Sequence, residues 1–256
     1  MLLLLPPSET KRTGGTGEPL DLNHLRYPSL NSQRRVLVRE LRALAGHPEA
    51  MMAALKLGRT QSGEVAHNRA LTTAPTMPAI DRYTGVLYDA LDAPTLTGAS
   101  RDWAASHVLV HSALFGPIGA LDPIPAYRLS TTSRLPGLVL KQHWGPRIAA
   151  LLAGETGLVL DLRSAGYVAL GGAPARPGSV LLRVVTETAD GRVRALNHFN
   201  KTAKGRLTRA LVRSAPALDS VDELLDWAAG AGFVLRPAGD GALELVDDAP
   251  PSRALA

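Results

Sequence analysis

The sequence predicts an α+β (mixed α/β) fold, a single compact domain with a mixed sheet and hairpins towards its C-terminal end. An uninterrupted apolar run, Met1 to Leu5, is typical of a short buried strand. In the C-terminal third, two pairs of strand-like runs enclose the dipeptides Asp190-Gly191 and Asp240-Gly241, which favour hairpin turns. Several segments between these regions carry apolar residues at helical spacing, so helices and strands share one core.

The expected helices follow from periodicity and end signals. Apolar residues at helical spacing predict a first helix over 29–45, which Gly46 closes. Pro48 suits the first turn of a second helix that ends near Gly58. Further helices are expected over 79–91, 144–152, 201–213 and 224–229. Asn200 is the expected cap of the helix over 201–213, and Ser220 that of the helix over 224–229.

The expected strands are short and apolar. After the first strand they cover 107–111, 158–160, 180–186, 193–199, 233–236 and 243–246, and residues 127–129 are expected to be extended. Residues 115–119, with two glycines and a proline, are expected to turn. We expect one domain over 1–256, with a loose loop at 12–28 and a frayed tail at 248–256.

The composition is that of an ordinary globular protein and excludes thiol chemistry. The chain has 256 residues, of which 45% are hydrophobic and 20% charged, and it has no cysteine. Disulfides, thiolate metal sites and a cysteine nucleophile are therefore excluded. The first apolar run is far too short to span a membrane, and no later stretch is long enough. We expect a cytoplasmic protein with no membrane contact and no obligate protein partner.

Positive charge is concentrated in one segment of the chain. The formal net charge is +5, but residues 191–218 hold seven basic residues and no acids, whereas residues 219–256 carry a net charge of −6. A basic helix with an anion bound beside it would explain this asymmetry. The alternative is a solvated helix whose lysines point into water.

Two lysines stand where they oppose the helix dipole. Lys201 and Lys204 fall in the first turn of the expected helix, where free backbone N–H groups are already positive. That placement makes sense where an anion binds, because amides and ammonium groups then converge on it. Arg206, Arg209 and Arg213 follow on one helix face.

Other motifs carry less information. No phosphate-loop, nucleophile-elbow or zinc-protease motif is present, and the glycines at 14–17 lack a dinucleotide-binding context. We expect no metal site, because His107 and His111 share one expected strand face with no carboxylate motif beside them. Trp144 is either a core residue or a platform on which a base could stack.

Eight blocks together resemble one bacterial family. They read LLPPSETK at 4–11, YTGVLY at 83–88, SALFG at 112–116, LD at 121–122, YRL at 127–129, WG at 144–145, DLRSAGY at 161–167 and FNKTAKGRLTR at 199–209. Their order and spacing resemble the YaaA family, which is linked to peroxide stress. One departure is Glu9, where relatives often have lysine, with Lys11 displaced by two positions.

The resemblance implies a compact α/β body with a positively charged cleft. Family members are described as DNA-binding, with a helix–hairpin–helix-like element, and as limiting oxidative DNA damage. On this first hypothesis the backbone amides of Gly116 and Gly119 grip a phosphate. Phosphates would also be neutralised by Lys201, Lys204, Arg206, Arg209 and Arg213.

The second hypothesis is an enzyme, because the blocks hold more hydroxyls and aromatics than a DNA-backbone binder needs. A purine-like base would then be oxidised at a ring nitrogen by hydrogen peroxide as co-substrate, without metal or flavin. The expected catalytic residues are Lys201, Lys11, Ser8 and Tyr83, a lysine being nucleophile or base. The expected ligand-binding residues are Thr10, Thr84, Arg128, Trp144, Ser164, Tyr167 and Lys204. A third option, an acidic C-terminal docking face, has no specific support.

Overall fold

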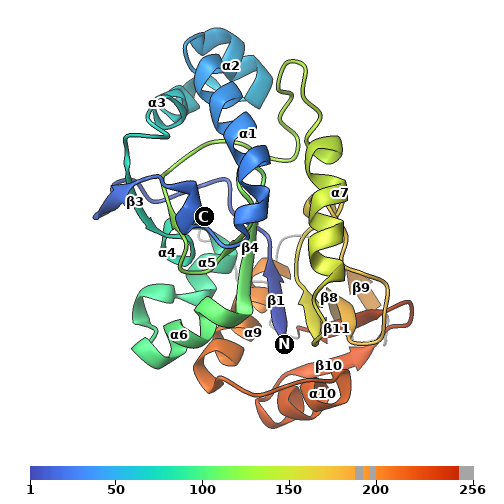
Figure 1. The fold of residues 1–256 in the computed structure, drawn as a ribbon. Helices are drawn as coiled ribbons and strands as arrows, with labels where there is room; N and C mark the ends of the chain where they lie inside the picture. Colours follow the sequence, from blue (N-terminus) through green and yellow to red (C-terminus); the bar gives the residue numbers. More distant parts are fainter. Residues whose placement is uncertain (188–192, 196–199, 248–256) are drawn as a thin grey trace, which may run out of the picture.

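A mixed sheet forms the centre of the protein. The computed structural model describes residues 1–187, 193–195 and 200–247, and the sheet has the order β10-β11-β8-β7-β1-β4-β5, with β9 beside β8 (Figure 1). The strands are β1 (Leu2–Leu5), β4 (Val108–Ser112), β5 (Gly116–Gly119), β7 (Val159–Asp161), β8 (Ser179–Glu187), β9 (Val193–Ala195), β10 (Val234–Pro237) and β11 (Ala242–Val246). Strands β4, β1, β7, β8 and β11 are parallel to one another. Strand β5 pairs antiparallel with β4, β9 with β8, and β10 with β11.

A second, smaller sheet packs beside the first. It has the order β2-β3-β6, with β2 (Gly17–Pro19), β3 (Pro75–Pro78) and β6 (Pro123–Ile124). Segment 12–28, expected as a loose loop, contains β2 and two 3-10 turns, η1 (Leu22–His24) and the start of η2 (Pro28–Leu30). The buried Arg82 side chain donates to the Arg12 and Gly14 carbonyls of this segment.

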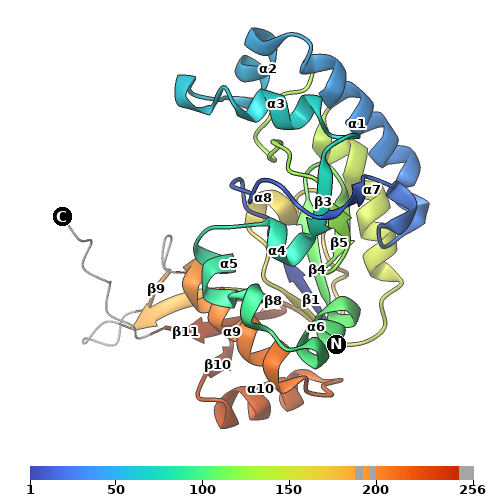
Figure 2. The ribbon, with the colours of Figure 1, turned by 90° about the vertical axis from the view of Figure 1, so that its left-hand side faces the viewer.

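Helices cover both faces of the main sheet. They are α1 (Asn31–Leu44), α2 (Pro48–Leu55), α3 (Glu64–Arg69), α4 (Ala79–Arg82), α5 (Val86–Leu91), α6 (Gly98–His107), α7 (Leu140–Ala153), α8 (Ala165–Val168), α9 (Asn200–Ser214) and α10 (Val221–Gly230), with short η3 (Arg59–Gln61) and η4 (Ala93–Thr95). Figure 2 shows α1 and α7 on one side of β4 and β5, and α4 and α5 on the other. None of the helices in the described part of the chain is both long and apolar enough to cross a bilayer.

The predicted fold class is confirmed, and most elements lie where they were expected. The first strand, the C-terminal hairpin and the Ser220 cap are present, and Ser220 accepts a hydrogen bond from the Glu223 N–H as half of a capping box. Strands β8 and β9 pair antiparallel, while the expected turn at 190–191, residues 196–199 and the tail at 248–256 lie outside the described residues. Helix α9 begins at Asn200, the residue expected to cap it.

Two local predictions are wrong. The single helix over 79–91 is broken, because Tyr83 bridges to Lys11 and the Thr84 N–H donates to the Thr10 carbonyl. Residues 116–119 form the buried strand β5 instead of a turn, so a helix–hairpin–helix element is absent from this position. Residues 127–129, expected to be extended, lie outside every helix and strand, and their extended conformation stays a prediction.

Trp144 explains why a glycine stands at the start of β5. A Cβ added to Gly116 would lie 3.0 Å from the Trp144 ring, and Gly116 has a φ of +67°. The ring is fully buried, and its Nε1 donates to the Ala113 carbonyl at 2.9 Å. Trp144 is therefore a core residue, and the predictions that it stacks on a ligand and that Gly116 and Gly119 bind phosphate are wrong, because all three are buried.

Helix α9 packs unusually close to α5. At Gly205 an added Cβ would lie 2.3 Å from the Leu87 carbonyl oxygen and 2.7 Å from the Ala90 Cβ. Both neighbours are fixed parts of a helix, so neither can move aside as the end of a flexible side chain could. Gly205 therefore sets the distance between the two helices.

We expect Gly205→Ala to destabilise the protein by about 1–3 kcal/mol, because overpacking must push the two helices apart. Gly145→Ala is the matched control, since it also lies inside a helix but has open space around it, and it should be neutral or slightly stabilising. Urea unfolding midpoints of the two variants test this. Equal midpoints would contradict the close-contact argument.

Candidate functional site

The loops that follow β1 and β7 meet at the carboxyl edge of the main sheet. Strand β1 lies between β4 and β7, and the chain passes from β1 to β4 on one side before it returns to β7 on the other. The strand order therefore reverses between β1 and β7. In open α/β sheets such a reversal leaves a crevice at the carboxyl ends of the strands, where ligands bind.

A cavity of about 630 Å³ lies at this reversal point. Its polar lining consists mainly of hydroxyl groups and amines. The lining residues are Pro6, Pro7, Ser8, Glu9, Thr10, Thr84, Gly85, Val86, Leu87, Tyr88, Ser130, Thr131, Leu162, Ser164, Tyr167, Asn200, Lys201 and Lys204. They come from α5, α8, the start of α9, and the segments that follow β1, precede α5, follow β7 and contain Ser130 and Thr131.

One wall of the cavity is the segment after β1, which is tied to the residues before α5. Ser8 Oγ lies 3.2 Å from Thr10 Oγ1, which donates to the Thr84 carbonyl at 3.3 Å. Gly85 has a φ of +97°, and an added Cβ would lie 3.2 Å from Ser8 Oγ. The glycine therefore lets two hydroxyl-bearing segments approach each other.

Lys11 lies behind this wall and does not line the cavity. Its Nζ donates to the Ser8 carbonyl at 2.9 Å and the Glu9 carbonyl at 3.2 Å, and it lies 4.1 Å from the centre of the Tyr127 ring. Burial, helped by the charge of Arg128, lowers the pKa of Lys11 to about 7. Lys11 holds the wall in place from behind.

A chain of hydroxyl groups continues beneath Lys11. Tyr83 Oη lies 2.8 Å from Tyr127 Oη, which lies 2.7 Å from Ser112 Oγ, and Ser112 accepts the backbone N–H groups that follow it. Burial raises the pKa of Tyr83 far above its ordinary value, so its phenol is neutral. Tyr83 is therefore a supporting residue below the cavity.

Arg128 supports the same wall from another side. Its guanidinium forms an ion pair with the Glu9 carboxylate and donates to the Glu9 carbonyl at 3.3 Å. Arg128 does not itself line the cavity, whereas Glu9 does.

The first turn of α9 supplies the two amines. Lys201 is exposed, and Lys204 is 6% exposed with its Nζ 2.9 Å from the Leu162 carbonyl oxygen. Burial lowers the pKa of Lys204 to about 8, although the nearby Asp161 carboxylate opposes this shift.

The arginines of α9 point to other partners. Arg206 forms an ion pair with Asp247 at 2.7 Å, and Arg209 donates to the Leu91 carbonyl at 2.7 Å and to Thr95 Oγ1 at 2.8 Å. Arg213 is exposed near the end of the helix. None of these three arginines lines the cavity.

The cavity brings together most of the residues that the sequence singled out. Ser8, Thr10, Thr84, Ser164, Tyr167, Lys201 and Lys204 line it, and Lys11, Tyr83 and Arg128 stand behind it. Tyr88, Ser130 and Thr131 also line it and were not predicted as site residues. Tyr88 lies in the block YTGVLY at 83–88, and Ser130 directly follows the block YRL at 127–129. Their position in or beside these blocks is the sequence feature that could have indicated them as site residues.

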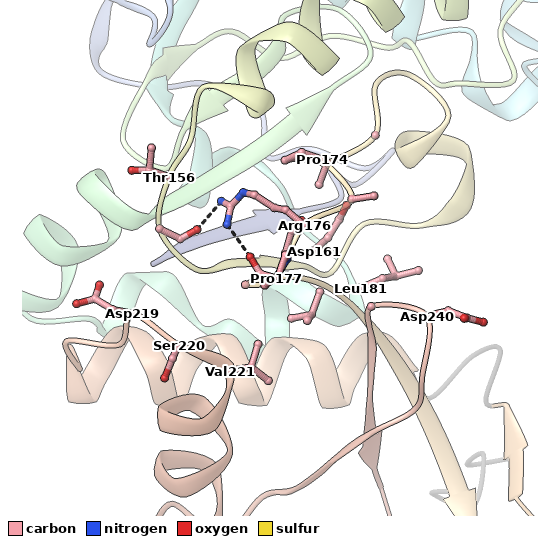
Figure 3. Close-up of a pocket in the computed structure, with 18 of the residues that line it drawn as sticks. Thr156, Asp161, Pro174, Arg176, Pro177, Leu181, Asp219, Ser220, Val221 and Asp240 are labelled. Atoms are coloured by element: carbon pink, nitrogen blue, oxygen red, sulfur yellow. Dashed lines mark hydrogen bonds between the residues drawn. The ribbon is translucent and has the colours of Figure 1, made fainter.

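A second cavity, of about 900 Å³, lies at the amino edge of the sheet. Figure 3 shows Arg176, from the loop before β8, and across the cavity Asp219 and Ser220 at the start of α10. Arg176 donates to the Glu155 and Gly157 carbonyls at 2.8 and 2.6 Å, so it closes a loop. The described residues around this cavity include no lysine, and they offer fewer groups for chemistry than the carboxyl-edge cavity does.

Comparison with known proteins agrees with the order and spacing of the motifs. The family model described as "Peroxide stress protein YaaA" matches residues 1–238. A UPF0246 protein of Corynebacterium efficiens is 43% identical over 241 residues, 92% of this chain and 95% of the relative. A UPF0246 protein of Streptomyces coelicolor is 42% identical over 240 residues, 91% of each chain, and one of Burkholderia mallei is 28% identical over 258 residues, 94% of this chain and 96% of the relative. With a match that runs through both walls of the cavity and the basic helix, the chain belongs to the YaaA family of peroxide stress proteins.

Proposed function

We propose that this protein binds a nucleobase-like molecule in the carboxyl-edge cavity and oxidises one of its ring nitrogens with hydrogen peroxide. The observation that carries the proposal is the convergence of Ser8, Thr84, Ser164 and Lys204 from four separate segments on one cavity. Its volume lies within the range of about 300–1,000 Å³ that is typical of small-molecule sites.

The lining suits a flat, polar ligand. Hydroxyl groups both donate and accept hydrogen bonds, so they can match ring nitrogens and exocyclic groups. Apolar surface from Pro6, Val86 and Leu162 lies between them. Lys201 is exposed and lines the cavity, where it can neutralise a phosphate if the ligand is a nucleotide.

The oxygen transfer balances without a thiol. The lone pair of a ring nitrogen attacks one oxygen of hydrogen peroxide, the O–O bond breaks, and the products are the N-oxide and water. The chain has no cysteine that peroxide could oxidise instead. The peroxide context comes from the family, and the ligand class comes from the cavity lining.

Binding to nucleic acid stays a prediction, and the arrangement of α9 gives it less support. Exposed Lys201 and Arg213 are available to phosphates, but Arg206 and Arg209 are engaged by partners within the protein. Duplex binding that weakens steeply with salt, and that is lost in the Lys201→Ala, Lys204→Ala, Arg209→Ala triple variant, would favour it.

The first prediction concerns the reaction. Incubation of the protein with adenine or guanine and hydrogen peroxide should give a product heavier by one oxygen, detected by mass spectrometry. Peroxide with the base alone is the background control. If every base tested gives only the background rate, the proposed oxidation is wrong.

The second prediction concerns Lys201. Lys201→Ala should weaken the binding of adenosine monophosphate roughly tenfold, since a charge-assisted contact is lost, and should change adenine binding little. Lys141→Ala is the control, because Lys141 is exposed on α7 and does not line the cavity. Calorimetric titration measures both ligands. Equal effects on base and nucleotide would contradict a phosphate contact.

The third prediction concerns the charge of Lys11. Its folded-state pKa is about 7 and its ordinary value is 10.5, so between these pH values the unfolded chain binds more protons. The free energy of unfolding should therefore gain at most about 1.4 kcal/mol per pH unit from this group as the pH rises above 7. Below pH 7 the full cost of the buried charge remains.

Urea unfolding at pH 7, 8 and 9 tests this. The free energy of unfolding of the natural protein minus that of Lys11→Met should rise with pH, because only the natural protein gains stability from Lys11. The same difference for Lys141→Met should stay constant. A constant difference for Lys11→Met would show that the ammonium is not destabilised by burial.

A further inference from the structure

The three lysines around the cavity differ in access and burial. Lys11 is separated from the cavity by the backbone of Ser8 and Glu9, to which its Nζ donates. Lys201 lines the cavity but is exposed to solvent. Lys204 alone among the described lysines is buried and also lines the cavity.

The ammonium group of Lys204 uses one of its N–H donors within the described part of the chain. It donates to the Leu162 carbonyl at 2.9 Å, and an ammonium has three N–H donors. Within the described residues no carboxylate lies in ion-pair distance of its Nζ. Asp161, the acid whose charge acts on Lys204, forms an ion pair with Arg163 at 2.5 Å.

The backbone around Lys204 is held firmly. Gly205, the next residue, contacts the Leu87 carbonyl of α5, and Thr208 Oγ1 donates to the Lys204 carbonyl at 2.8 Å. The side chain therefore enters the cavity from a fixed helix, as a group that must meet a reacting atom should.

We propose that Lys204 is the general acid of the oxygen transfer, an inference that rests on the proposed function. As the ring nitrogen attacks one peroxide oxygen, the O–O bond breaks and the Lys204 ammonium protonates the departing hydroxide, which leaves as water. The neutral amine then takes the proton from the newly bound oxygen, so the N-oxide is released and the ammonium is regenerated. No electron or atom is needed beyond those of the base and hydrogen peroxide.

The charges that face Lys204 allow this cycle near neutral pH. Asp161 favours its ammonium form, and burial, the larger influence, favours the amine, which brings the pKa to about 8. Burial raises the pKa of Tyr88 and of Tyr167 well above their ordinary values, so both phenols stay neutral. Two further charged groups line the cavity, Glu9, which Arg128 neutralises, and Lys201.

The test uses the full chain and two substitutions, Lys204→Gln and Lys204→Arg. Glutamine can keep a hydrogen bond to the Leu162 carbonyl but cannot give up a proton, and arginine keeps the positive charge but holds its proton too tightly. Both should lower N-oxide formation by about 100-fold or more, a typical effect of losing a general acid. Base binding, measured by calorimetry, should stay within about threefold, and Lys141→Gln should keep the full rate.

The pH profile gives a second readout that does not depend on how well a variant folds. The rate of the natural protein should fall as the pH rises through about 8, because the ammonium is the reactive form. If the natural protein forms no N-oxide, the proposed function fails and this inference fails with it. If it forms the N-oxide and Lys204→Gln or Lys204→Arg retains the rate, or if the rate does not fall above pH 8, only the general-acid role is overturned.

Discussion

The loops at the carboxyl edge of the sheet depend on buried and half-buried cations that donate to backbone carbonyl groups. Lys11 holds the Ser8 and Glu9 carbonyls, Lys204 holds that of Leu162, and Arg163 holds that of Gly171 at 2.9 Å. Loop carbonyls have no strand partner, and leaving them buried without a donor is costly. A lysine or arginine meets this need but loses its own hydration. The cavity wall and the lowered pKa values of Lys11 and Lys204 therefore have one physical origin, since the burial that lets these lysines reach the loop carbonyls also lowers their pKa values.

The same kind of contact recurs elsewhere in the protein. Arg34 donates to the Phe115 carbonyl at 2.9 Å and to the Pro117 carbonyl at 3.1 Å, which secures β5, and Arg82 donates to the Ile124 carbonyl at 3.1 Å, which secures the small sheet. Both guanidinium groups are buried, and burial lowers the pKa of each to about 10, so both remain charged at neutral pH. Arginine suits this role because its five donors can serve several carbonyls at once. The loops of β5 and of the small sheet are therefore secured, like those around the cavity, by hydrogen bonds from cationic side chains.

Local signals in the sequence predicted many of the elements, and the features that depend on long-range contacts could not be predicted. The run Met1–Leu5, the Ser220 cap and the final hairpin follow from neighbouring residues, so they could be read directly. The break near Tyr83 could not, because it depends on pairing with Lys11 and Thr10, more than 70 positions away. For the same reason nothing local showed that Gly116 makes room for Trp144. The composition of the cavity was predictable where a motif carried its chemistry, as at Ser8 and Ser164. The groups that support the cavity were harder to predict, because nothing in the sequence distinguishes a buried arginine such as Arg163 from an ordinary surface arginine.

Helix α9 shows why a cluster of basic residues in sequence does not become a basic surface. A helix of 15 residues points its side chains in all directions, so the five cations along it do not share one surrounding. Arg206 forms an ion pair with Asp247, and Arg209 donates to the Leu91 carbonyl at the end of α5. Both contacts stabilise the position of the helix. Lys201 and Lys204, in the first turns, meet the cavity, where the free N–H groups of the helix end add to their positive potential. A DNA duplex needs charges spread along a surface, whereas a small ligand needs them at one point. The grouping of Lys201 and Lys204 at the cavity, with Arg206 and Arg209 engaged elsewhere, therefore favours a small ligand.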